Sequence, residues 1–415
     1  MDIADYTHDR IRRRDLLRLT AAAGAALALP NIARLSLAQS QLAADAGASP
    51  QPPSGDLVRF PEKTDLILLT DRPPQLETPL SYFREDLTPN EAFFVRWHLA
   101  NIPTKVSPDT FELSVAGHVA NELSLSLDDM RKQFEPVSVV AVNQCSGNSR
   151  SLFSPRVPGG QWANGAMGNA RWTGVRLGDL FKKAAVKAGA VDVSFAGLDR
   201  PPQPSVPAFV KALAFDHASN GEVIVAYEMN GKPLPMLNGY PLRLVVPGWF
   251  ATYWVKALSE ITVLKEKFHG FWMDKAYRIP NNPEIAETPD SLAKETVPIN
   301  KMPVRSLFVS PATGTTVKAG AAVEVEGLAF DSGSGIAKVE VSVDGKTWAD
   351  ARLDPEIGKY SWRRWRYKWT PATPGVVTLM ARATNVAGQT QRPEQNWNRS
   401  GYARNLIESV GVTIK

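Results

Sequence analysis

Short apolar runs separated by turn-forming residues dominate the chain from about Leu80 onwards. Apolar runs of four to eight residues predict strands, whereas apolar residues three and four positions apart predict a helix. One segment with helical spacing occurs at residues 176–188. Four strands are predicted around it, at residues 93–98, 111–115, 137–142 and 242–246. The region up to about residue 300 is therefore predicted to be mixed α and β.

Beyond about Val304 helical periodicity stops and strand-turn-strand patterning takes over. Asp344-Gly345 directly follows one predicted strand and is typical of a tight hairpin turn. The strands predicted here are at residues 323–326, 339–343, 362–369 and 376–381. This pattern fits an immunoglobulin-like β-sandwich. We therefore predict an α+β protein, with a mixed α/β domain at residues 81–300 followed by a β-sandwich at residues 301–415.

Residues 1–38 have the order of an export signal. Arg12-Arg13-Arg14 precede a run of small and apolar residues from Leu19 to Leu29, and Ser36-Leu37-Ala38 offers a cleavage site. Consecutive arginines ahead of Leu16-Leu17 resemble a twin-arginine signal, and an arginine-rich secretory signal is the alternative. The apolar run is shorter than the roughly 20 residues that a membrane span needs. The sequence predicts a periplasmic mature protein without a membrane span.

Residues 39–80 are rich in Ala, Ser, Gln and Pro without a sustained period, which predicts an N-terminal arm or linker. The net charge of +5 is too small to indicate a nucleic-acid partner, and we find no nucleic-acid motif. Cys145 is the only cysteine. An exported chain with one cysteine forms no internal disulfide, and without Cys-x-x-Cys-His no covalently attached haem is expected.

Cys145 lies among turn-forming residues in the stretch 143–150, which ends in Arg150. A nearby arginine and turn amides favour the reactive thiolate form. The residue is therefore a candidate ligand or nucleophile. An inert buried cysteine is the alternative, because free cysteine is among the most buried residue types.

Cations interrupt two of the predicted strands. Arg96 and His98 are two positions apart and project to the same face. Arg243 stands within an apolar strand. A buried arginine requires an anionic partner, whereas an arginine that reaches water from a strand does not. The sequence leaves both interpretations open.

The stretch 159–172 is too rich in glycine for a regular element. Its backbone amides suit a phosphate or a ring system, although it matches neither a Walker nor a Rossmann fingerprint. A long surface loop is the alternative. Further along, Asn230-Gly231 predicts a tight turn.

Four motifs occur in order along the chain. They are Phe-Val-Arg-x-His at 94–98, Cys-x-Gly-Asn-x-Arg at 145–150, Gly-Ala-x-Gly-x-Ala-Arg-Trp at 165–172 and Ala-Tyr-Glu-Met-Asn-Gly at 226–231. With them the chain resembles the sulfite oxidase family of molybdenum enzymes from about Phe93 to the C-terminus. The resemblance is greatest to the bacterial periplasmic sulfite dehydrogenases.

This resemblance implies a molybdenum–molybdopterin cofactor with a single pyranopterin, whose metal is bound by Cys145. It implies no haem in this chain. The residues it places around the pterin are His98, Asp199, Asn238, Arg243 and Lys256. The residues it places at the substrate are Arg96, Arg150, Trp162, Tyr277 and Arg404. Arg399 is a rival for the role of Arg404, and Asn238 stands where vertebrate relatives have a histidine.

The reaction implied by the resemblance is oxidation of sulfite to sulfate. Electrons would pass one at a time to an external c-type cytochrome, and the sandwich would form a homodimer. The alternative within the family is reduction of nitrate or a sulfoxide. Convergence of Arg96, Arg150 and Arg404 favours a compact dianion over a sulfoxide. A non-catalytic binding protein is a further alternative, and it predicts no bound metal.

Overall fold

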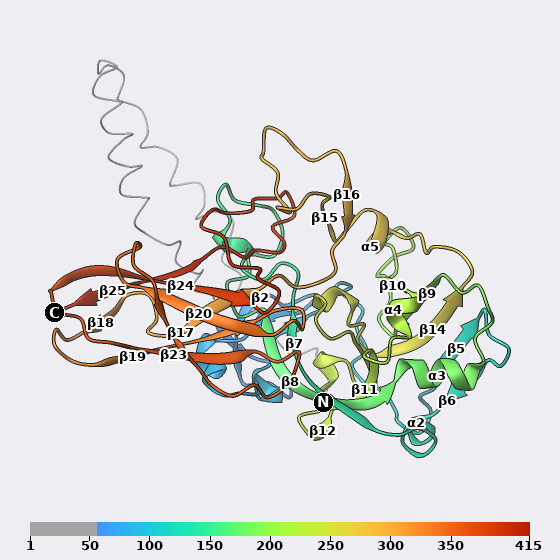
Figure 1. Cartoon of the computed structure of the whole chain (residues 1–415). Helices are drawn as coiled ribbons and strands as arrows, with labels where there is room; N and C mark the ends of the chain where they lie inside the picture. Colours follow the sequence, from blue (N-terminus) through green and yellow to red (C-terminus); the bar gives the residue numbers. More distant parts are fainter. Residues whose placement is uncertain (1–55) are drawn as a thin grey trace, which may run out of the picture. The chain divides into compact units, whose positions relative to one another are not determined.

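The computed structural model describes residues 56–415, so the predicted export signal at residues 1–38 lies outside the described residues. Strands predominate, and the helices are short (Figure 1). The predicted α+β class is confirmed: a mixed region with sheets and helices is followed by a β-sandwich. Among residues 56–415, no helix combines the length and apolarity needed to cross a bilayer.

The first sheet has the order β1-β2-β3-β4. Its strands are β1 (Leu57–Arg59), β2 (Asp65–Thr70), β3 (Gln75–Glu77) and β4 (Val95–Arg96). Leu66 and Leu76 are fully buried in a small core with Val95 and Trp97. The described part of the predicted arm, residues 56–80, is therefore part of the folded structure. Its pairing with β4 fixes the strand that carries Arg96.

Two five-stranded sheets and several short helices build the rest of the mixed region. One sheet has the order β10 (Val210–Ala214), β9 (Asp192–Gly197), β14 (Leu258–Leu264), β5 (Leu113–Gly117) and β6 (Leu123–Leu125). The other has β12 (Lys232–Pro233), β11 (Ile224–Met229), β8 (Met167–Arg176) and β7 (Val137–Gln144), with β13 (Arg243–Val245) paired to β11. The helices are α2 (Leu127–Lys132), α3 (Leu177–Ala184), α4 (Phe215–Ala218) and α5 (Phe271–Asp274). A separate ladder joins β15 (Arg278–Pro280) to β16 (Thr296–Pro298).

The helix predicted at 176–188 is α3, and its periodic apolar side chains are all buried. It ends where Ala185 adopts a left-handed backbone conformation, with φ of 49°. Asn230 and Gly231 have φ of 53° and 74°, as a two-residue turn between β11 and β12 requires. The strand predicted at 93–98 is shorter than expected, because only Val95–Arg96 joins the β3 ladder.

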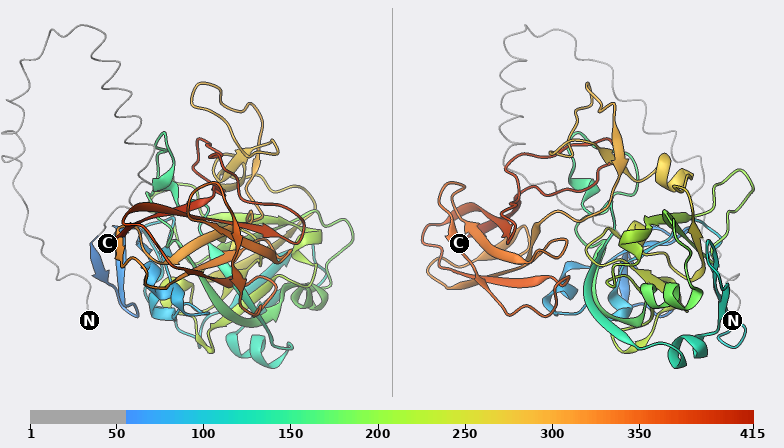
Figure 2. Two further views of the ribbon diagram at one scale, coloured as in Figure 1. Left: turned by 60° about the vertical axis from the view of Figure 1, so that its left-hand side comes forward. Right: turned by 45° about the vertical axis from the view of Figure 1, so that its right-hand side comes forward.

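The C-terminal region is a sandwich of two sheets (Figures 1 and 2). One contains β17 (Arg305–Ser310), β19 (Val323–Phe330), β23 (Arg363–Trp369) and β22 (Arg352–Leu353). The other contains β18 (Thr315–Val317), β25 (Glu408–Ile414), β24 (Gly375–Asn385), β20 (Ile336–Ser342) and β21 (Ala349–Asp350). Side chains from both sheets share one buried core that includes Val325, Trp365 and Leu379. β20 and β21 pair as the predicted antiparallel hairpin, but residues 343–348 separate them, so Asp344-Gly345 lies in a longer loop rather than in a tight two-residue turn.

Gly174 provides a test of the β8–β11 pairing. A Cβ atom at this position would lie 2.0 Å from the Val225 carbonyl oxygen, so a side chain forces the two strands apart. We expect Gly174→Ala to lower the free energy of unfolding by at least about 2 kcal/mol. Urea denaturation measures this loss. Gly411→Ala is the control, since no atom lies within 4 Å of its Cβ position; equal stability losses in the two variants would contradict the described pairing.

Candidate functional site

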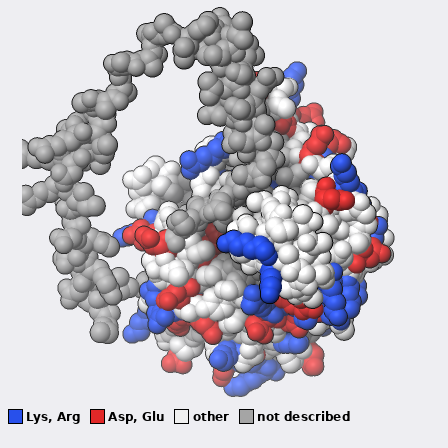
Figure 3. Space-filling model, turned by 90° about the vertical axis from the view of Figure 1, so that its left-hand side faces the viewer, with Lys and Arg blue, Asp and Glu red and all other residues white. Residues whose placement is uncertain are grey.

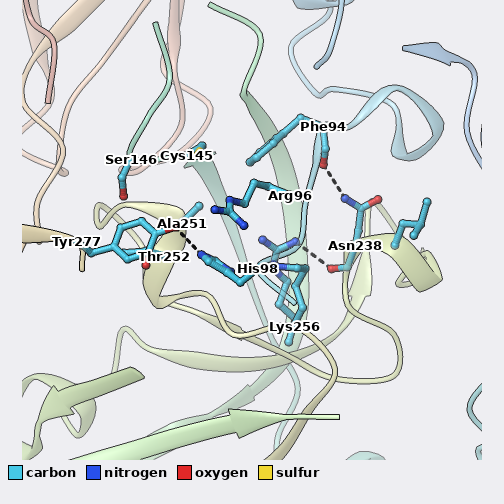
Figure 4. Close-up of a pocket in the computed structure, with 12 residues that line it drawn as sticks. Phe94, Arg96, His98, Cys145, Ser146, Asn238, Ala251, Thr252, Lys256 and Tyr277 are labelled. Carbon is cyan, nitrogen blue, oxygen red and sulfur yellow. Dashed lines mark hydrogen bonds between the residues drawn. The ribbon is translucent and has the colours of Figure 1, made fainter. Parts of the chain in front are cut away.

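One pocket gathers most of the site residues that the sequence predicted. Figure 4 shows its lining residues, which include Cys145, Ser146 and Arg96, and the hydrogen bond between His98 and Tyr277. The predicted residues that line it are Arg96, His98, Cys145, Asn238, Arg243, Lys256 and Tyr277. They come from segments far apart in the sequence, and the fold brings them together at one place.

Cys145 directly follows β7 and begins a tight turn. Its backbone N–H donates to the Ala166 carbonyl at 2.9 Å, and its carbonyl accepts from the Asn148 N–H at 3.0 Å. Asn148 in turn accepts from the Ala166 N–H through Oδ1, at 2.9 Å. The cysteine loop, residues 145–150, is therefore fastened at two points to the glycine-rich loop, residues 159–166. The stretch 159–172 was expected to form no regular element, but its residues from Met167 onwards belong to β8. The thiol is 7% exposed and lines the pocket, a position suited to a metal ligand.

Arg243 is buried in the pocket without a carboxylate partner. It donates to the Asn238 carbonyl at 2.9 Å and to Asn143 Oδ1 at 3.1 Å, and its guanidinium lies over the rings of Trp172 and Trp254. Its Nε has no hydrogen-bond partner within the described chain. Burial lowers the pKa of Arg243 to about 9. A cation held in this way is poised for an anionic ligand.

His98 and Tyr277 form a buried hydrogen-bonded pair. The pKa of His98 is held well below its usual range, first by burial and then by the nearby cations Arg96, Lys256 and Lys211. Burial raises the pKa of Tyr277. Both side chains are therefore uncharged near neutral pH. Tyr277 also has a left-handed backbone, with φ of 59°, and such local strain is often found at functional sites.

Arg150 and Trp162 lie beside the pocket rather than in its lining. Arg150 donates to the Ser400 carbonyl and to the Gly160 carbonyl, each at 3.0 Å, and its guanidinium lies over the Tyr402 ring. Trp162 is 1% exposed and packs edge-on against Phe94, which does line the pocket. Trp162 therefore supports the wall of the pocket, whereas Arg150 ties the segment around Gly160 to the segment around Ser400.

The remaining predicted residues face other groups. Arg404 is buried and pairs with Glu408, and it is not among the residues that line the pocket. Its rival Arg399 pairs with Glu287 at 2.6 Å. Asp199 is buried near the pocket; burial raises its pKa and Lys256 opposes that rise.

Lys63 is a residue of the site that the sequence did not reveal. It is 6% exposed and donates to the carbonyls of Asn90 and Phe93, at 2.7 and 3.2 Å, and to the Asn238 side chain. Asn238 also donates to the Phe94 carbonyl at 3.0 Å. The Asn238 amide thus fixes this wall of the pocket as well as lining it. A lysine in a stretch without periodicity gave no signal of this role.

Two further unpredicted residues shape the site. Glu77 accepts from the Ala163 and Gly165 N–H groups, at 2.9 and 2.7 Å, and so holds the glycine-rich loop. Tyr402 stacks parallel to Tyr277, with ring centroids 5.6 Å apart. Tyr402 brings a segment from the end of the sandwich sequence to the edge of the site.

The donor set fits an anionic, metal-bearing cofactor. Arg96, Arg243 and Lys256 line one pocket, and within residues 56–415 none of them forms an ion pair with a carboxylate. Ser146 Oγ is also buried there without a hydrogen-bond partner in the described chain. Buried unpaired cations and hydroxyls are costly, so a ligand that pairs with them stabilises the protein.

Two family models match the chain. An oxidoreductase molybdopterin-binding domain matches residues 99–272, and a Mo-co oxidoreductase dimerisation domain matches residues 296–414. The mitochondrial sulfite oxidase of Rattus norvegicus is 34% identical, over 88% of this chain and 68% of its own. The sulfite oxidase of Arabidopsis thaliana is 31% identical, over 79% of this chain and 88% of its own.

A solved structure shares the fold. The sulfane dehydrogenase SoxCD from Paracoccus pantotrophus aligns with a TM-score of 0.72 over 95% of this chain and 94% of that one. Its sequence identity is 21%, so the similarity bears on the fold alone.

Lys211 makes the stability of the folded protein depend on pH. It is fully buried beside Tyr277, and burial lowers its pKa from 10.5 to about 7. Between these values the unfolded chain holds a proton that the folded chain lacks, so stability rises with pH. For the cofactor-free protein we expect Lys211 to raise the free energy of unfolding by at least about 1 kcal/mol between about pH 7 and about pH 9. Urea denaturation at each pH measures the rise, and an undiminished rise in Lys211→Met would refute this assignment.

Proposed function

Because the chain belongs to the sulfite oxidase family, we propose that it oxidises sulfite to sulfate at a molybdenum–molybdopterin cofactor and passes the electrons to a c-type cytochrome. The chain shares molybdenum-dependent oxidation of sulfur with its relatives. The observation that carries the finer assignment is the pocket in which the lone thiol, Cys145, meets cations without carboxylate partners. Sulfite and sulfate are compact anions, and such a pocket suits them.

Cys145 would bind the metal through its thiolate, and Arg243, Lys256 and His98 would hold a single pyranopterin. Arg243 suits a phosphate because its guanidinium donates in a planar fork. The neighbouring Lys256 has its ammonium over the Trp97 ring, 4.7 Å from the centroid. When bound, the cofactor supplies oxygen-atom transfer and accepts two electrons. The protein's part is to orient it and to supply the cations around it.

Arg96 is the arginine best placed for the substrate, since it alone of Arg96, Arg150 and Arg404 lines the pocket. Arg150 lies just behind, so its charge adds to the field at the site. Fixed cations that face a developing negative charge lower its energy without reorganising. The uncharged pair of His98 and Tyr277 holds a proton between Nε2 and Oη next to Arg96. These residues bind the dianion, and the neutral pair places a hydrogen-bonding group beside it.

The export signal expected at residues 1–38, with its twin-arginine pattern, supports a periplasmic location. A c-type cytochrome is an acceptor suited to that compartment. Such an acceptor takes electrons one at a time, so turnover of one sulfite would reduce two cytochromes.

Sulfite-dependent reduction of cytochrome c by wild type and by Cys145→Ser tests this function. A serine hydroxyl is a poor ligand for a soft metal centre, so we expect the rate to fall at least about 100-fold. Matching far-ultraviolet circular dichroism shows that the variant is folded. Normal turnover by Cys145→Ser would show that Cys145 is not the metal ligand.

A small one-electron dye in place of cytochrome c separates the substrate from the acceptor. Wild-type activity with the dye but not with cytochrome c keeps sulfite as the substrate and rejects that acceptor. Activity with neither, together with oxidation of a reduced dye by nitrate or a sulfoxide, rejects sulfite oxidation.

The sandwich is proposed to join two copies of the chain, as the match to a dimerisation domain over residues 296–414 supports. Among the described residues on the face shown in Figure 3, acidic and basic side chains are interspersed. Two such surfaces can approach without the repulsion of a single-sign patch.

Light scattering of the purified protein tests the homodimer. We expect a mass of about twice that of one mature chain at micromolar concentration, because obligate homodimer interfaces bury large areas. A single-chain mass at that concentration contradicts the proposal.

A further inference from the structure

Arg305 reaches from the sandwich into the loop that carries Cys145. It is the first residue of β17 and is 1% exposed. Its Nη2 donates to Ser149 Oγ at 2.7 Å and to Asn164 Oδ1 at 2.9 Å. Ser149 lies four residues after Cys145, and Asn164 lies two residues before Ala166, whose carbonyl accepts from the Cys145 N–H. One guanidinium therefore touches both loops that position the thiol.

The backbone at Ser149 needs such support. Its φ of 68° places a non-glycine residue in the left-handed region, which costs of order 1 kcal/mol or more. Its N–H donates to the Ala163 carbonyl at 2.6 Å, and its hydroxyl bonds to both Asn164 and Arg305. A strained residue persists when its surroundings fix it from several sides. Arg305 is the contact on Ser149 that comes from the sandwich.

Glu408 sets the direction of Arg305. It is buried on β25 and accepts from Arg305 Nη2 at 2.7 Å, while Arg404 Nη1 bonds to the same oxygen. Two arginines thus share one carboxylate. Removal of Arg305 leaves the neutral pair of Arg404 and Glu408, whereas removal of Glu408 leaves two buried cations together. Substitution of Arg305 is therefore the milder way to probe this cluster.

We propose that Arg305 is a positioning residue for Cys145, acting through Ser149 and Asn164. The sandwich then does more than join two chains, because it also fixes the position of the Cys145 thiol within its own chain. Arg404, which does not line the pocket, contributes by helping Glu408 hold Arg305. The importance of this thiol position for catalysis rests on the proposed function, but the positioning itself does not require the metal.

The reactivity of Cys145 in the cofactor-free protein measures this positioning. Cys145 is the only thiol in the chain, so the rate of alkylation by iodoacetamide reports on this residue alone. Arg305→Met removes both loop contacts, so the loop opens more easily and exposes the thiol, and we expect alkylation to speed up on the order of tenfold. Ser149→Ala, which removes one of these contacts but leaves the Arg305–Glu408 pair in place, should act in the same direction.

Arg364→Met is the matched control. Arg364 is also a buried sandwich arginine, 6% exposed, and its partners are the Phe83 carbonyl at 3.3 Å and Asp86 at 3.5 Å, neither of which belongs to the loops that position the thiol. Cys145 in Arg364→Met should be alkylated at the wild-type rate. Equal rates in Arg305→Met and Arg364→Met, or an unchanged rate in a folded Ser149→Ala, would overturn the proposal.

In the loaded enzyme, the visible absorption of the thiolate–metal bond gives a second readout. This band should shift in Arg305→Met and stay in place in Arg364→Met. The alkylation result stands whether or not the protein carries molybdenum, so failure of the positioning and failure of the proposed function are told apart.

Discussion

Burial of positive charge without carboxylate partners is the constraint on which this structure depends. Arg243 at the pocket, Lys211 beside Tyr277 and Lys63 behind Asn238 are satisfied by carbonyl and amide oxygens and aromatic faces. Such contacts hold a cation in place but do not neutralise it. Burial therefore lowers the pKa of these groups, to about 9 for Arg243 and to about 7 for Lys211 and Lys63, and an anionic cofactor and an anionic substrate are the groups that would keep them protonated.

The two parts of the described chain build this pocket jointly. The mixed region supplies the lining, whereas the C-terminal region supplies supports that reach it from outside. Arg305 holds the cysteine loop, the Ser400 carbonyl anchors Arg150, and the Tyr402 ring stacks on Tyr277. Each contact joins residues more than a hundred positions apart. We therefore expect substitutions in the sandwich to change the reactivity of the Cys145 thiol.

The sequence predicted features whose cause is local. Asn230-Gly231 forms its tight turn because the backbone conformation there is decided by the two residues themselves. The pocket residues from Arg96 to Tyr277 were predicted from motifs shared with a family. Contacts chosen only in the folded chain escaped prediction: Glu408 holds Arg404, Glu287 holds Arg399, and Lys63 is buried from a stretch with no periodicity. An arginine's partner depends on which carboxylate folding brings near it.

Molybdenum analysis of the purified protein, combined with anomalous X-ray diffraction at the molybdenum edge, shows whether the lone thiol binds molybdenum. We expect one molybdenum atom per chain, bonded to Cys145 Sγ in the pocket that Arg96, Arg243 and Lys256 line. A protein that oxidises sulfite without molybdenum, or with the metal bound elsewhere in the chain, would contradict this expectation.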